Sequence, residues 1–137
     1  MSSIACVFPG QGSQHPEMLK TDLVDQSFIN EKIQIVSEIL SSDVHSILED
    51  ESKLNLTSFT QPLLVLSSAI FSEAYKNLSL SDPKVIAGHS LGEYSALMFA
   101  DSITFEDTIK ITHLRGNLMQ SSEEGKMMAI LGLDSKI

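Results

Sequence analysis

The segment at positions 85–95 reads Val85-Ile86-Ala87-Gly88-His89-Ser90-Leu91-Gly92-Glu93-Tyr94-Ser95. Its first part is a short apolar run, and a helical pattern starts directly after its second glycine. The part between them matches the G-x-S-x-G nucleophile elbow, in which a serine stands on a sharp turn from strand to helix. A Cβ atom at either glycine would crowd the neighbouring backbone. The segment therefore predicts a nucleophile at Ser90, where the N–H of Leu91 and the helix dipole stabilise a negative oxygen. The alternative is a surface Gly-Ser turn, because the motif alone recurs by chance.

Length and composition set limits on the class of protein. The chain has 137 residues, at most one domain, and 42% of them are hydrophobic, which is enough to bury a core. The formal net charge of −9 argues against a nucleic-acid partner. The N-terminus does not resemble a signal peptide, and the apolar run 62–71 is too short to span a bilayer. The single cysteine, Cys6, excludes an internal disulfide and is expected to be a buried thiol in a reducing cytosol. We therefore expect a cytoplasmic protein without a membrane segment.

The N-terminal residues predict a strand followed by a loop. The apolar run 4–8 suits a buried parallel strand, and residues 9–14, Pro-Gly-Gln-Gly-Ser-Gln, must form a loop. The loop partly imitates a dinucleotide-binding fingerprint, but His15 stands where the third glycine belongs. Gln11 between its glycines is placed to present a backbone N–H to a ligand. An ordinary β-to-α turn is the simpler reading of this stretch alone.

The remaining periodicity predicts an α/β fold with a mostly parallel sheet. A helical pattern covers 25–51, with a break and a new cap at 41–43. A second pattern covers about 60–78, where apolar residues on most sides of the helix predict that it is central. Residues 54–59 read as irregular, with Thr60 as the next cap. After the elbow helix at 93–99, Thr104 and Asp107 form a near capping box for a further helix, and a strand is expected at 127–131.

A serine nucleophile needs a base, and the four histidines do not supply an obvious one. His89 directly precedes Ser90, so its side chain is expected on the opposite face. His113 shares a predicted helix with Arg115, the only arginine, but lies about 200° away around the axis. His15 and His45 have no acidic partner at a suggestive spacing. We therefore expect the catalytic machinery to be incomplete within these residues.

Five motifs in order along the chain resemble one family. They are 8–14 (Phe-Pro-Gly-Gln-Gly-Ser-Gln), 60–62 (Thr-Gln-Pro), 88–97 (Gly-His-Ser-Leu-Gly-Glu-Tyr-Ser-Ala-Leu), Arg115-Gly116 with Met119-Gln120, and 125–134. The chain is similar to the malonyl-CoA:acyl carrier protein transacylases of fatty-acid synthesis, relatives of the acyltransferase domains of polyketide synthases. The resemblance extends from end to end of the chain but matches only about the first half of such an enzyme.

The resemblance implies roles for individual residues. Ser90 would take the malonyl group from coenzyme A as an ester and pass it to the phosphopantetheine thiol of acyl carrier protein. The backbone N–H groups of Gln11 and Leu91 would form the oxyanion hole, and Arg115 would bind the malonyl carboxylate. No metal or organic cofactor is expected. The family's histidine base would lie beyond these residues, so that this chain alone is expected to be inactive.

The resemblance also implies the domain organisation. Residues 1–124 would be the N-terminal part of a large α/β-hydrolase-like subdomain, and 125–137 the first strand of a small ferredoxin-like subdomain, incomplete here. Two alternatives stay open. A serine esterase or thioesterase shares the elbow but has no use for Arg115 or the Gln11 loop, and a truncated product without turnover would share every motif.

Overall fold

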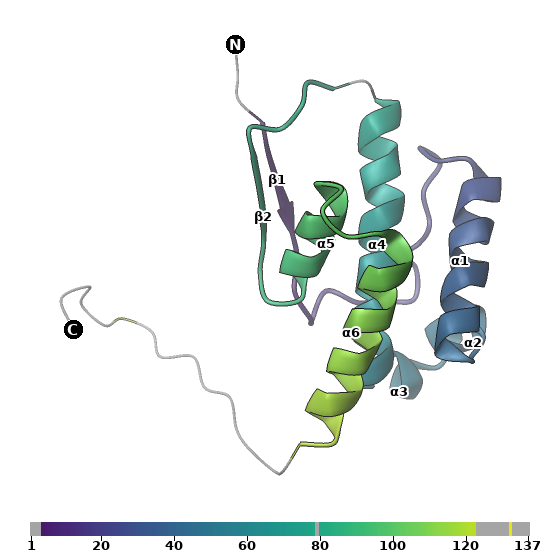
Figure 1. Cartoon of the computed structure of the whole chain (residues 1–137). Helices are drawn as coiled ribbons and strands as arrows, with labels where there is room; N and C mark the ends of the chain where they lie inside the picture. The colour runs from purple at the N-terminus through teal and green to yellow at the C-terminus, as the bar shows by residue number, and fades with distance from the viewer. Residues whose placement is uncertain (1–3, 79, 123–131, 133–137) are drawn as a thin grey trace.

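The computed structural model describes residues 4–78, 80–122 and 132. The elements follow in the order β1 (Ala5–Phe8), α1 (Gln26–Leu40), α2 (Val44–Glu49), α3 (Glu51–Leu54), α4 (Thr57–Asn77), β2 (Val85–Gly88), α5 (Gly92–Phe99) and α6 (Phe105–Gln120). In Figure 1, α4 runs between α1 on one side and α5 with the two strands on the other. The chain is thus α/β with a small parallel sheet, as predicted. The strand expected at 127–131 lies outside the described residues.

The two strands pair in parallel, with Ala5 opposite Val85 and Phe8 opposite Gly88. The prediction that the first strand is buried is wrong for most of its length. Phe8 is buried, but Val7 is 72% exposed and Val85 on the partner strand is 56% exposed. Within the described residues the sheet has two strands, and α5 is the helix that packs on both of them. An apolar strand is buried on both faces only where helices cover both.

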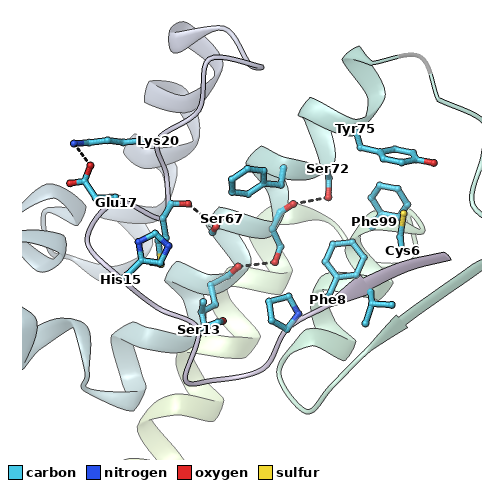
Figure 2. A pocket seen from close by; sticks show the side chains of 16 residues that line it. Cys6, Phe8, Ser13, His15, Glu17, Lys20, Ser67, Ser72, Tyr75 and Phe99 are labelled. Atoms are coloured by element: carbon cyan, nitrogen blue, oxygen red, sulfur yellow. Dashed lines mark hydrogen bonds and ion pairs between the residues drawn. The ribbon is translucent and has the colours of Figure 1, made fainter. Parts of the chain in front are cut away.

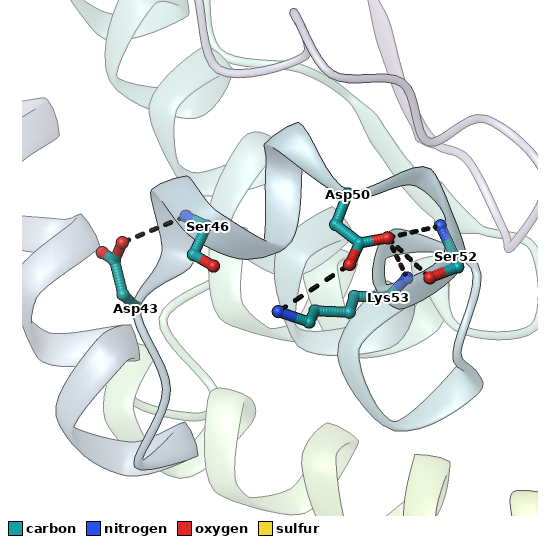
Figure 3. A network of polar contacts seen from close by, with 5 residues as sticks. All are labelled: Asp43, Ser46, Asp50, Ser52 and Lys53. Atoms are coloured by element: carbon teal, nitrogen blue, oxygen red, sulfur yellow. Dashed lines mark hydrogen bonds and ion pairs between the residues drawn. The ribbon is translucent and has the colours of Figure 1, made fainter.

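Carboxylates begin three of the helices as local sequence rules require. Asp25 accepts a hydrogen bond from the Ser27 N–H at the start of α1, and the break after α1 is made by Ser41 in the left-handed conformation. Figure 3 shows the next two caps, Asp43 on the Ser46 N–H and Asp50 on the N–H groups that begin α3. The predicted break and re-cap at 41–43 are therefore confirmed. Among the described residues, no helix is long and apolar enough to cross a membrane.

The central helix α4 begins earlier than predicted. Residues 54–59 are not irregular: α3 ends at Leu54 and α4 starts at Thr57. Thr60 is not a cap, because its hydroxyl donates back to the Leu54 carbonyl at 2.6 Å from inside the helix. The cap residue of α4 is Leu56, whose side chain cannot accept a hydrogen bond. The central position of α4 is confirmed, since residues 60–66 are all buried.

Candidate active site

The predicted strand–turn–helix elbow is present. β2 ends at Gly88, α5 begins at Gly92, and Ser90 between them has φ of 53°. A Cβ atom on Gly88 would lie 2.0 Å from the Gly92 carbonyl carbon, and one on Gly92 would lie 2.2 Å from the Phe8 carbonyl oxygen. Both glycines are therefore sterically required. A left-handed conformation is costly for serine, and such strain is typical of functional turns. The turn leaves Ser90 exposed at its tip.

The loop after β1 lies against this elbow. The His89 N–H donates to the Phe8 carbonyl at 3.1 Å, and a Cβ atom on Gly10 would come within 2.9 Å of both the ring Nδ1 and the carbonyl oxygen of His89. Gln11 follows directly in this loop, and its side chain donates to the Thr57 hydroxyl at 3.3 Å. Within the described part of the chain, the backbone N–H groups of Gln11 and Leu91 donate to no other residue.

Arg115, on α6, lies next to Ser90. Its Nη2 donates to the Ser90 hydroxyl oxygen at 3.3 Å, and its Nη1 donates to Gln61 Oε1 at 2.7 Å. The guanidinium carbon lies 5.9 Å from the centre of the Tyr94 ring. Arg115 is half-buried, so it keeps access to solvent and to a ligand. The structure brings together the predicted nucleophile and the predicted carboxylate-binding arginine, which are 25 positions apart in the sequence.

A proline in α4 and a histidine in α6 fix how these helices dock. Pro62 has no N–H, so the Ser58 carbonyl loses its usual helical partner four residues later. His113 Nδ1 takes that place, at 2.9 Å from the Ser58 oxygen. Because a carbonyl only accepts, Nδ1 carries the proton, and Nε2 faces the Asn117 amide nitrogen at 3.2 Å. His113 therefore has a structural role.

Two further residues of α6 bring the helices close. A Cβ atom on Gly116 would lie 2.6 Å from the Thr57 carbonyl oxygen, so only glycine allows this approach. Gln120 Oε1 accepts from both the N–H and the hydroxyl of Ser58, at 3.2 and 3.1 Å. Gln120 thus supplies the N-terminal cap that Leu56 cannot. These contacts set the register of α6 on α4 and thereby the position of Arg115.

None of the four histidines hydrogen-bonds to Ser90 in the described structure. His113 is bonded to the Ser58 carbonyl, and the ring of His89 lies beside Gly10. His15 lines the cavity described below, and His45 is an exposed residue of α2. The described residues therefore hold an exposed serine on the elbow, two N–H groups without an internal acceptor and a cation, and none of their histidines hydrogen-bonds to that serine.

The cavity shown in Figure 2 is separate from this site. It has a volume of about 450 Å³ and lies between β1, the loop after it, α4 and the end of α5. Neither Ser90 nor Arg115 lines it. Cys6 does, and it is half-buried rather than buried as predicted. Ser67 and Ser72 on its wall donate to the carbonyls of Met18 and Ser68, so their hydroxyl hydrogens are already engaged.

Two residues of the site were not predicted. Gln61 belongs to a quoted motif, but nothing in the sequence assigned it the contact with Arg115, and Tyr94 was read only as part of the elbow helix. The available signal for Gln61 was an amide side chain directly before the apolar run that begins at Pro62. Its partner lies 54 positions away and is brought to it by tertiary packing.

The fold is α/β, and Ser90 stands on a strand–turn–helix elbow beside the guanidinium of Arg115. The profile described as acyl transferase domain matches residues 5–137, and the chain belongs to this family. The chain is 41% identical over 142 residues to the malonyl CoA-acyl carrier protein transacylase of Haemophilus influenzae, covering 99% of this chain and 46% of that protein. A Staphylococcus aureus protein of the same name is 40% identical, with 44% of its length covered. The chain thus spans less than half the length of these relatives.

Solved structures agree with this assignment. An acyl carrier protein S-malonyltransferase from Vibrio cholerae superposes with a TM-score of 0.78 at 44% identity, covering 88% of this chain and 40% of that one. The malonyl CoA-acyl carrier protein transacylase from Coxiella burnetii gives 0.79 at 39% identity, covering 87% and 38%. A type II polyketide synthase acyl carrier protein in complex with its malonyl-transacylase contains a chain that gives 0.79 at 38% identity, covering 87% and 39%.

Proposed function

We propose that this chain carries the nucleophile half of a malonyl-CoA:acyl carrier protein transacylase site. The observation that carries the proposal is the contact between Arg115 Nη2 and Ser90 Oγ at 3.3 Å. An acyl group esterified to Ser90 would have its far end at the guanidinium. A malonyl group places a carboxylate there, and a planar guanidinium binds a carboxylate through two parallel hydrogen bonds. The names of the relatives support the same substrate pair.

The steps follow from the proposed roles of the residues. Ser90 Oγ attacks the thioester carbonyl of malonyl-CoA, and its proton passes to a base outside the described contacts. The N–H groups of Gln11 and Leu91 stabilise the tetrahedral oxyanion, aided by the N-terminus of α5. Coenzyme A leaves as the thiol, and Ser90 holds the malonyl ester. The phosphopantetheine thiol of acyl carrier protein then attacks this ester and restores Ser90.

The finer parts of the assignment belong to the same proposal. We assign residues 1–124 to a large α/β-hydrolase-like subdomain and 125–137 to a small ferredoxin-like one; of the latter, only residue 132 lies within the described structure. Fatty-acid synthesis in the cytoplasm is the setting that a malonyl donor and an acyl carrier protein imply. No cofactor enters the proposed steps.

The test is a hybrid enzyme in which this chain replaces the matching part of the Haemophilus influenzae relative. Incubation with malonyl-CoA followed by peptide mass spectrometry should place the malonyl adduct on Ser90, and the hybrid should load acyl carrier protein. The Ser90→Ala hybrid is the control and should do neither. An adduct on Cys6 or on another serine would refute the assignment. Hydrolysis of acyl-CoA without transfer to the carrier would favour an esterase instead.

A further inference from the structure

Gln61 is a fully buried polar residue near the N-terminal end of α4. Its Oε1 accepts from Arg115 Nη1 at 2.7 Å, and its Nε2 donates to the sulfur of Met119 at 3.2 Å. A guanidinium has only donors, so the amide oxygen must face Arg115 and the amide nitrogen must face the thioether. The orientation of Gln61 is therefore fixed by the two α6 residues between which it lies.

The contact with Gln61 holds the Arg115 side chain without neutralising its positive charge. Gln61 offers a neutral oxygen, and the ring of Tyr94 offers an uncharged face. Among the described residues, the ion pairs within 4.0 Å all involve lysines, and no carboxylate pairs with Arg115. The guanidinium is thus aimed at Ser90 by groups that leave its positive charge uncompensated.

A glutamate at this position would have a different consequence, although its shape is almost the same. A carboxylate facing a guanidinium forms a strong charge-assisted pair. That pair would compete with an incoming acyl carboxylate for the same donors. Neutrality of the acceptor at position 61 is therefore the property that keeps Arg115 available for an acidic acyl group.

We propose that Gln61 is a positioning residue for Arg115: it aims the guanidinium at the acyl end of the Ser90 site while preserving its charge for a carboxylate. This inference rests on the proposed malonyl transfer and adds the residue that makes Arg115 selective. The competing explanation is that Gln61 only fills the interface between α4 and α6. The two explanations differ in what they predict for the reactivity of Arg115.

The chain itself offers a direct readout, because Arg115 is its only arginine. Phenylglyoxal modifies arginine, so the mass of the intact protein reports modification at this one side chain. We would measure the modification rate of wild type, Gln61→Glu and Gln61→Met, each alone and with malonyl-CoA. Acetyl-CoA, which lacks the distal carboxylate, is the matched control ligand.

If Gln61 positions Arg115, the three proteins should differ in their rates of phenylglyoxal modification in a definite order. Without ligand, Gln61→Met should react faster than wild type, and Gln61→Glu slower by about tenfold or more, because a buried charge-assisted pair holds the guanidinium. Malonyl-CoA should protect the wild type, acetyl-CoA should protect it much less, and malonyl-CoA should add little protection in Gln61→Glu. Circular dichroism of each variant confirms that it is folded.

Equal modification rates in all three proteins would overturn the inference, as would full malonyl-CoA protection in Gln61→Glu. If malonyl-CoA fails to protect the wild type, the proposed function is refuted instead, and the order of rates without ligand still decides the role of Gln61. If Gln61→Glu fails to fold, Gln61→Met and Met119→Leu carry the test. Both should speed modification, the first by removing the acceptor and the second by freeing the amide to rotate.

Discussion

Replacing Ser90 by glycine should leave the protein more stable than replacing it by alanine. Ser90 has φ of 53°, in the left-handed region that costs an L-residue about 1–2 kcal/mol relative to right-handed helix. Glycine removes this cost but adds about 0.4–1 kcal/mol of unfolded-state entropy. Both variants lose the hydrogen bond from Arg115, so this loss cancels when the two are compared. We expect Ser90→Gly to be more stable than Ser90→Ala by roughly 0.5–1 kcal/mol.

Ser41 provides the matched control. It has φ of 50° as the C-cap residue of α1, and α1 and the elbow helix α5 lie on opposite sides of α4 (Figure 1). Ser41→Gly and Ser41→Ala should differ by a similar amount. The assay is urea unfolding of all four variants, followed by circular dichroism and compared at equal m-values.

The reasoning would be refuted if the glycine advantage appeared at Ser41 and not at Ser90. That result would mean that the elbow in solution does not hold its serine in the left-handed conformation. If the advantage appears at both positions, the strain at Ser90 is a cost that the fold carries at the proposed nucleophile.

Three further outcomes can be measured. Gly116→Ala should lower the free energy of unfolding, measured in urea, by up to about 2 kcal/mol, because overpacking against the Thr57 backbone exceeds the helix-propensity gain of about 1 kcal/mol. The control Leu118→Ala, at an exposed position, should change it by no more than about 0.5 kcal/mol. In the hybrid enzyme, Arg115→Ala should lower malonyl transfer at least about tenfold and spare acetyl transfer; a parallel fall of both would make Arg115 structural. Hydrogen bonds from Ser27 and Ser52 lower the pKa values of Asp25 and Asp50 in the folded state. The two carboxylates therefore contribute to stability above the ordinary aspartate pKa, and this contribution is lost as the pH falls through their lowered pKa values. An Asp25→Asn, Asp50→Asn double variant should accordingly lose less stability than the wild type between neutral pH and about pH 2.

Much of the site's local framework was predictable from the sequence because it depends on neighbouring residues. The elbow requires glycines on both sides of its serine, and steric contact between Gly88 and Gly92 makes that requirement local. Asp43 and Thr104 cap helices through N–H groups three positions later. Such contacts form wherever the local backbone forms, so residue type and spacing are sufficient to predict them.

Other features depended on partners far apart in the sequence. The sequence by itself shows that Pro62 deprives the Ser58 carbonyl of its helical partner, but not that His113, 55 positions away from Ser58, replaces it. The start of α4 was predicted wrongly because its cap comes from Gln120, across the interface with α6. The contact of Gln61 with Arg115 also depends on the packing of α6 against α4. Residue types determined which groups needed partners, and only the packing of α6 on α4 decided which partners they received, because hydrogen bonds act over a few ångströms whatever the separation along the chain.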